Sequence, residues 1–232
     1  MSVEPKPSGT VVVIRDGREH LEVLLLQRSR SRSTWVFPGG KVEEVDQSAQ
    51  SGDAQELARN AAVREAFEEA GLALSAPDLL PISRWITPEM ARKRFDTWFF
   101  VVRAEPDTEI RVDGAEICDH RWLAPQRVLE AHHRHEMRLA PPTFVTVSWL
   151  VGHDTAADAI DALGRESPLT FRPRVCSTAD GGCMLYPGDA GYQEGDAERP
   201  GPRHRLWVLP DGWRYERPAA GDRKVLSPSS SS

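Results

Sequence analysis

Residues 64–72 read Arg-Glu-Ala-Phe-Glu-Glu-Ala-Gly-Leu, and this stretch decides both the fold and the chemistry that we expect. It forms the second half of a helix predicted over residues 53–71. Asp53 is a residue type that caps helix N-termini, and Gly71 suits the left-handed position that ends a helix. The segment is therefore expected to be a well-delimited helix of about five turns.

The two sides of this helix differ in character. On a helical wheel, the side expected to face the core carries Val63, Ala66, Phe67 and Ala70. The opposite side carries three carboxylates, Glu65, Glu68 and Glu69. Like charges at this spacing cost a few tenths of a kcal/mol per pair, but a hard divalent cation such as Mg²⁺ favours such an oxygen cluster. The pattern predicts either a metal-binding face or a solvated surface face.

The surrounding sequence favours the metal-binding interpretation. Residues 40–72 resemble the Nudix box, whose pattern is G-x5-E-x7-R-E-U-x-E-E-x-G-U, where U is aliphatic. The second half of the pattern matches in Arg64, in the three glutamates, in Gly71 and in Leu72. The segment also follows an FPGG run at residues 37–40, as the box commonly does in that family.

The first half of the box departs from the pattern. Counting from Gly40, the family's first glutamate falls on Asp46, and Asp46 precedes Arg64 by 18 positions where the family has 8. About ten residues are therefore inserted, which a surface loop tolerates at little cost. Either Asp46 or Glu56 could hold the arginine, and we favour Glu56 because it lies on the same predicted helix.

The resemblance implies a metal-dependent reaction. Nudix proteins hydrolyse a nucleoside diphosphate linked to another moiety, with Mg²⁺ or Mn²⁺ neutralising the phosphates. By this resemblance, Glu65 and Glu69 are the expected metal ligands, Glu68 shares a second ion, and the Gly40 carbonyl completes the shell. Acidic side chains can meet a polyanionic pyrophosphate only through such cations.

The resemblance also implies catalytic roles. Arg64 is expected to orient a carboxylate rather than to touch the substrate. The general base varies within the family, so it is either a box glutamate, Glu65 or Glu68, or a glutamate on a later loop. Glu116 is the candidate on a later loop, although an ordinary loop acid would look the same.

Further segments narrow the expected substrate. Residues 25–40 are similar to the LLxRS…FPGG run of coenzyme A-directed Nudix proteins. Residues 85–88, 94–100 and 141–143 resemble the RWxTP, RFDTxFF and PPT segments of a long-chain subgroup. That subgroup includes the peroxisomal acyl-coenzyme A diphosphatases and carries an insertion in its box. The implied ligand is a small nucleoside diphosphate derivative of the coenzyme A type.

Coenzyme A requires cations for its phosphates and an apolar wall for its long arm. The candidate substrate-binding residues are Arg28, Arg30, Arg32, Trp85, Arg94 and Phe95. Two alternatives stay open. The same metal face could serve ADP-ribose, NADH or a nucleotide sugar, and a Nudix scaffold without catalysis could bind a nucleotide as a sensor.

The fold class expected from the resemblance is α/β, an α/β/α sandwich with a mixed sheet. Residues 10–14 and 22–27 are predicted strands of a hairpin. Helical periodicity ends near residue 168, so we expect a Nudix domain over 1–168 and a β-rich extension over 169–232 with a disordered serine-rich tail. The extension could cap the site, form a homodimer contact or cover a sheet face.

Composition excludes several classes of protein. Lys plus Arg total 29 and Asp plus Glu total 35, so the net charge of −6 argues against nucleic-acid binding. No apolar run approaches the ~18–20 residues that cross a membrane, and residues 1–9 lack a secretory signal. Three cysteines without paired spacing favour a reducing compartment, so a cytoplasmic location is expected.

Overall fold

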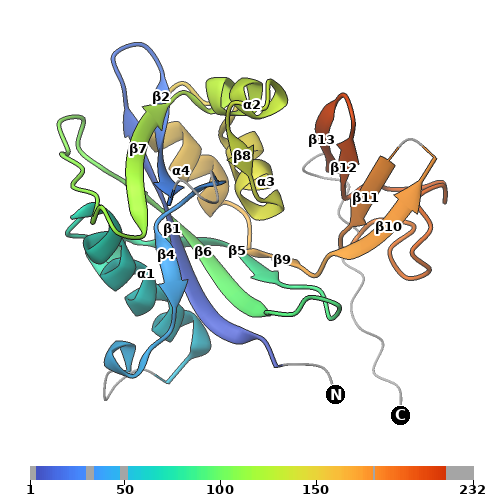
Figure 1. The fold of residues 1–232 in the computed structure, drawn as a ribbon, viewed down its shortest axis with the longest axis horizontal. Coiled ribbons are helices and arrows are strands. Elements are labelled where there is room, and N and C mark those ends of the chain that lie inside the picture. Colours follow the sequence, from blue (N-terminus) through green and yellow to red (C-terminus); the bar gives the residue numbers. More distant parts are fainter. Residues whose placement is uncertain (1–3, 30–33, 48–51, 180, 218–232) are drawn as a thin grey trace. The chain divides into compact units, whose positions relative to one another are not determined.

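The computed structural model describes residues 4–29, 34–47, 52–179 and 181–217. The chain divides into two compact units, Met1–Phe171 and Arg172–Ser232. The first unit holds a mixed β-sheet and the helices, and the second holds a small antiparallel sheet (Figure 1).

The sheet of the first unit is built around the predicted hairpin. Its strands are β1 (Lys6–Asp16), β2 (Leu21–Arg28), β3 (Thr34–Val36), β4 (Gly39–Lys41), β5 (Leu80–Ile86), β6 (Phe95–Arg103), β7 (Ile117–Leu123), β8 (Arg138–Leu139) and β9 (Leu169–Phe171). The main path runs β8-β3-β2-β1-β6-β5-β9, with β1 parallel to β6 and antiparallel to β2. The sheet is therefore mixed, as expected.

The hairpin opens into a fork that positions the FPGG run. Paired residues of β1 and β2 extend from the turn only as far as Ile14 and Val23. Beyond that point β3 pairs with β2, and β4 pairs with β1. Gly40 consequently lies opposite Gly9 in the sheet.

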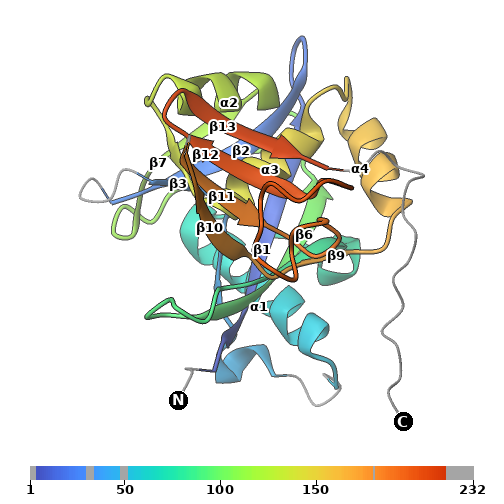
Figure 2. The ribbon, with the colours of Figure 1, turned by 90° about the vertical axis from the view of Figure 1, so that its right-hand side faces the viewer.

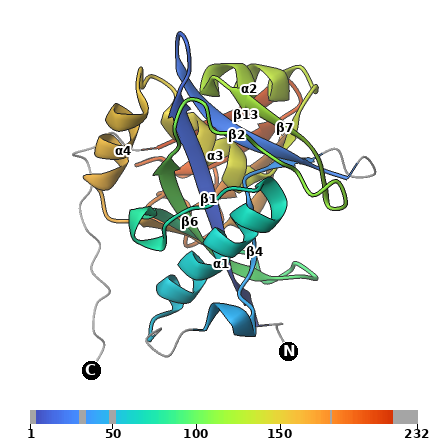
Figure 3. The same ribbon diagram turned by 90° about the vertical axis from the view of Figure 1, so that its left-hand side faces the viewer.

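Helices cover both faces of this sheet. They are α1 (Ala54–Ala70), α2 (Pro125–His133), α3 (Pro141–Leu150) and α4 (Ala156–Gly164), with short 3₁₀ turns η1 (Glu44–Asp46) and η2 (Ala76–Asp78). Figure 3 shows α1 crossing in front of β1, and Figures 1 and 3 together place α2 and α3 on the other side. This is the expected α/β/α arrangement, and no helix in the described residues is long and apolar enough to span a bilayer.

The ends of α1 confirm the sequence prediction. The Asp53 carboxylate accepts a hydrogen bond from the Gln55 N–H at 2.8 Å, which satisfies one free donor of the first turn. Gly71 ends the helix with φ of 70°, and its N–H donates to carbonyls of the last turn. Glycine readily adopts the left-handed conformation that this position requires.

The face that α1 buries differs from the wheel prediction. The packed positions are Ala58, Ala61, Ala62, Ala66 and Ala70, each 0% exposed. Phe67, predicted to face the core, is 62% exposed, whereas Glu69 is only 4% exposed. The prediction for Phe67 is wrong because the helix rests on the sheet along its alanine row, which turns the phenyl ring outward.

The second unit is an antiparallel sheet of β10 (Arg174–Thr178), β11 (Gly181–Leu185), β12 (Arg205–Leu209) and β13 (Gly212–Glu216), in that order (Figure 2). Its centre is an ion pair between Asp189 and Arg205, with N–O distances of 2.6 and 2.7 Å and both side chains 0% exposed. Asp189 also accepts the N–H groups of Gly191 and His204. The β-rich character predicted for this region is confirmed, and β9 belongs instead to the sheet of the first unit.

Close packing of α1 on the sheet depends on Gly9. A Cβ at this position would lie 1.7 Å from the Ala58 carbonyl oxygen, which is backbone and cannot rotate away. The helix therefore approaches β1 more closely than any residue with a side chain would allow.

Replacement of Gly9 by alanine is expected to destabilise the protein, because α1 must move away from the sheet. Overpacking of this kind costs about 2–3 kcal/mol, or about 5–10 °C in melting temperature. Gly52→Ala is the matched control, since nothing lies within 4 Å of a Cβ there. Thermal unfolding by circular dichroism measures both, and equal melting temperatures would contradict the close approach.

Candidate functional site

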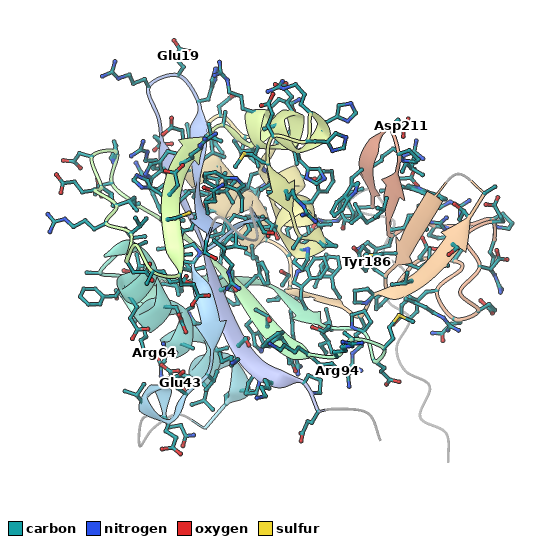
Figure 4. All side chains as sticks on the ribbon, in the orientation of Figure 1. Glu19, Glu43, Arg64, Arg94, Tyr186 and Asp211 are labelled. Atoms are coloured by element: carbon teal, nitrogen blue, oxygen red, sulfur yellow. The ribbon has the colours of Figure 1, made fainter. Side chains whose placement is uncertain are left out.

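Arg64 is the centre of a cluster of charged groups on α1 (Figure 4). Its guanidinium meets both Asp46 oxygens at 3.0 and 3.1 Å, and it donates to the Lys41 carbonyl at 2.9 Å. The same group lies 3.0 Å from Glu65 and 2.9 Å from Glu68. Hydrogen bonding to Asp46 is the largest influence that raises the Arg64 pKa, so the arginine stays charged.

Asp46, and not the favoured Glu56, holds the arginine. The Asp46 side chain is 2% exposed, and the Glu43 N–H donates to it at 2.8 Å within η1. Glu56 is exposed near the start of α1. The preference for Glu56 is wrong because η1 places Asp46 against the Arg64 side chain. The count of residues from Gly40 in the family pattern, which falls on Asp46, indicates the correct residue.

Glu69 is a buried carboxylate beside the glycines of β4. The Gly39 N–H donates to its Oε2 atom at 2.9 Å. Burial, reinforced by the charge of Glu65, raises the Glu69 pKa to about 7, although the Gly39 hydrogen bond and the Arg28 charge oppose the shift. Burial likewise raises the Glu65 pKa.

Gly40 leaves the space that Glu65 occupies. A Cβ on Gly40 would lie 2.0 Å from the Glu65 Oε1 atom. Glycine at this position therefore lets the carboxylates of α1 approach the backbone of β4. Gly40 thus lies beside Glu65, and the role expected of its carbonyl as a metal ligand stays a prediction.

Glu116 and Arg28 lie next to these carboxylates. Arg28 Nη2 is 3.7 Å from Glu116 Oε1, and the Ser29 N–H donates to the Glu116 carbonyl at 2.9 Å. A β-bulge interrupts the pairing of β2 with β7 between Gln27 and Arg28. Bulges redirect side chains, and the charges of both Arg28 and Glu116 affect the Glu69 pKa. The structure thus gathers Glu65, Glu68, Glu69, Gly40, Arg64, Glu116 and Arg28.

The remaining substrate-binding candidates lie elsewhere or outside the described residues. Trp85 is 4% exposed and stacks on Phe171 with ring centres 3.9 Å apart. Arg94 is 8% exposed and donates to the Thr87 carbonyl at 3.2 Å, and Figure 4 shows it away from Arg64. Phe95 is a half-buried residue of β6 whose N–H donates to the Thr87 hydroxyl.

Arg30 and Arg32, also predicted to bind substrate, lie outside the described residues. Of the basic strip proposed from the sequence, the structure therefore describes Arg28.

A cavity of about 790 Å³ lies near the tip of the β1–β2 hairpin, away from these acids. Its lining includes Arg15, Glu22, Trp122 and Arg127. Arg15 pairs with Glu22 at 2.8 Å and its guanidinium covers the Trp122 ring at 4.2 Å. Glu22 lies six positions before Arg28 on β2, which is about 20 Å along the strand, and the lining of the cavity includes none of the glutamates of α1.

The acidic site suits a hard divalent cation in its donor chemistry. No group of three or more His, Cys, Asp or Glu in the described residues is arranged to hold a metal ion as it stands. Arg64 draws Glu65 and Glu68 to itself, and Gly39 holds Glu69. Asp46 shares the charge of Arg64, and Glu69 accepts a backbone N–H. Divalent cations held by Glu65, Glu69 and Glu68 would balance the charge of these carboxylates.

Removal of the Glu69 charge is expected to stabilise the metal-free protein. A carboxyl with a folded pKa near 7 and an unfolded pKa near 4.5 binds more protons when folded, so stability falls as pH rises between these values. In EDTA at pH 8, the free energy of unfolding of Glu69→Gln should therefore exceed that of the wild type by on the order of 1–3 kcal/mol. The two free energies should converge near pH 4.5. Urea unfolding at both pH values measures this, and a less stable variant at pH 8 would contradict the assignment.

Comparison with known proteins agrees with this geometry. Residues 5–144 match the NUDIX domain. The chain is 33% identical over 117 residues to the human acyl-coenzyme A diphosphatase NUDT19. The aligned region covers 48% of this chain and 31% of that protein. It is 26% identical over 159 residues to the putative nudix hydrolase 7 of Caenorhabditis elegans, and the aligned region covers 52% of each chain. The chain thus spans from a third to a half of the length of these relatives.

A solved structure supports the assignment of the fold. A NUDIX hydrolase from Alicyclobacillus acidocaldarius superposes with a TM-score of 0.61 at 23% identity, covering 68% of this chain and 96% of that one. The glutamates of α1, the arginine that Asp46 holds and the glycines of β4 all lie within the matched domain. The chain belongs to the Nudix family.

Proposed function

We propose that the protein is a Mg²⁺-dependent diphosphatase that cleaves coenzyme A or an acyl-coenzyme A. The products are adenosine 3′,5′-bisphosphate and phosphopantetheine or its acyl form. The observation that carries this proposal is the buried Glu69 beside Glu65 and the β4 glycines, with a pKa raised to about 7. Buried acids of this kind suit a site that takes up a divalent cation together with a polyanion.

The chain's own groups divide the work of hydrolysis. Glu65, Glu69 and the Gly40 carbonyl would hold Mg²⁺, for which Mn²⁺ is expected to substitute, and Glu68 would share a second ion. Cations held there would neutralise charge on the phosphates. A water oxygen forms a new bond to phosphorus, the bridging P–O bond breaks, and a carboxylate accepts the water's proton. Glu116 is the proposed acceptor, and the partly exposed Arg28 guanidinium is placed to meet a phosphate oxygen.

The coenzyme A substrate is supported by the relatives and by the site's charge. The human relative carries the name acyl-coenzyme A diphosphatase and matches about half of this chain. Arg28 offers a cation beside the acids, whereas Trp85 is packed in the core and supports no stacking on adenine in this structure. ADP-ribose, NADH and nucleotide sugars share the diphosphate and are the rival substrates.

Turnover of coenzyme A should exceed turnover of ADP-ribose, NADH and a nucleotide sugar at equal concentration with Mg²⁺. Chromatography of the products should show adenosine 3′,5′-bisphosphate. Glu69→Gln should lower kcat on the order of 10³-fold, because electrostatic stabilisation in such sites is worth several kcal/mol.

Lys93→Gln is the matched control for these assays, because it removes an exposed charge outside the cluster. Faster hydrolysis of ADP-ribose would reject the coenzyme A assignment and keep the diphosphatase. An unchanged rate in Glu69→Gln would remove α1 from the mechanism.

A further inference from the structure

The loop that leads into β7 is organised by one carboxylate. A single Asp113 oxygen, Oδ1, accepts the N–H groups of Ala115, Glu116 and Ile117 at 2.8, 3.1 and 2.9 Å. The Gly114 N–H also donates to the Ile117 carbonyl at 3.0 Å. Three consecutive backbone donors on one oxygen fix the path of the chain through Glu116.

The same backbone is also held from the side of β2. The Ser29 N–H donates to the Glu116 carbonyl at 2.9 Å, and Ile117 is 0% exposed in the core cluster beneath α1. With its N–H bound by Asp113 and its carbonyl bound by Ser29, Glu116 keeps freedom only in its side chain. Arg28 Nη2 lies 3.7 Å from the Glu116 carboxylate, and the charges of both residues act on the Glu69 pKa.

We propose that Asp113 is a positioning residue that holds Glu116 in place to accept the proton of the attacking water. This inference rests on the proposed function. A general base must lie within hydrogen-bond reach of its proton, and misplacement by about 1 Å costs up to 10²-fold in rate. Asp113 is itself exposed, and within the described part of the chain its side-chain hydrogen bonds go to the loop backbone, so we expect its effect on the reaction to pass through Glu116.

A double-mutant cycle tests this role. Glu116→Gln should lower kcat about 10²-fold, as expected for loss of a general base. Asp113→Ala should lower kcat about tenfold and leave KM within about twofold, because it displaces the base without removing a substrate contact. In the Glu116→Gln background, Asp113→Ala should lower kcat no further. Asp113→Asn, whose amide oxygen can accept the same N–H groups, should retain kcat within about twofold of the wild type.

Asp107→Ala is the matched control, because Asp107 is exposed in the same connection between β6 and β7. Its kcat should equal that of the wild type, and melting temperatures verify that every variant is folded. An additive effect of Asp113→Ala in the Glu116→Gln background would overturn the proposal, as would full activity of Asp113→Ala or of Glu116→Gln. Absence of wild-type hydrolysis of any nucleoside diphosphate derivative would instead overturn the proposed function itself, and this inference with it.

Discussion

The close contact between α1 and the glycine-lined strands β1 and β4 is the constraint on which the site depends. Gly9 lets the helix backbone approach β1, and Gly40 leaves room for the Glu65 carboxylate. A helix held further away would leave Glu65 and Glu69 in solvent, where like charges separate and carboxyl pKa values stay ordinary. The buried alanines of α1 also allow this close approach, since small side chains permit a short separation between the helix and the sheet.

This packing produces an imbalance of charge among the carboxylates of α1. Arg64 is the cation nearest to Glu65 and Glu68, but Asp46 engages it through both of its oxygens. Among the described residues, Glu69 accepts the Gly39 N–H and feels the charge of Arg28, but burial dominates and raises its pKa to about 7. Under the proposed function, binding of a cation and a polyanion would recover the cost of burying this group.

Local signals predicted the parts of the fold that depend on local chemistry. Asp53 and Gly71 delimit α1 because capping and left-handed conformations are properties of single residues. The exposure of Phe67 was missed because the rotation of a helix is set by the surface on which it packs. The contacts of Asp46 and Asp113 depend on the paths of the loops that carry them. For Asp113, the Asp-Gly pair at residues 113–114 is a turn signal in the sequence. Trp85 and Arg94 match a family segment, yet their contacts place them in the core.

A crystal soaked in Mn²⁺ at saturating concentration shows whether the glutamates of α1 bind a cation, because anomalous scattering locates the ion without assuming a ligand. We expect a peak about 2.1 Å from carboxylate oxygens of Glu65 and Glu69, with Glu65 turned away from Arg64. Carboxylates that stay on Arg64 and on the Gly39 N–H, with no anomalous peak beside them, would contradict it.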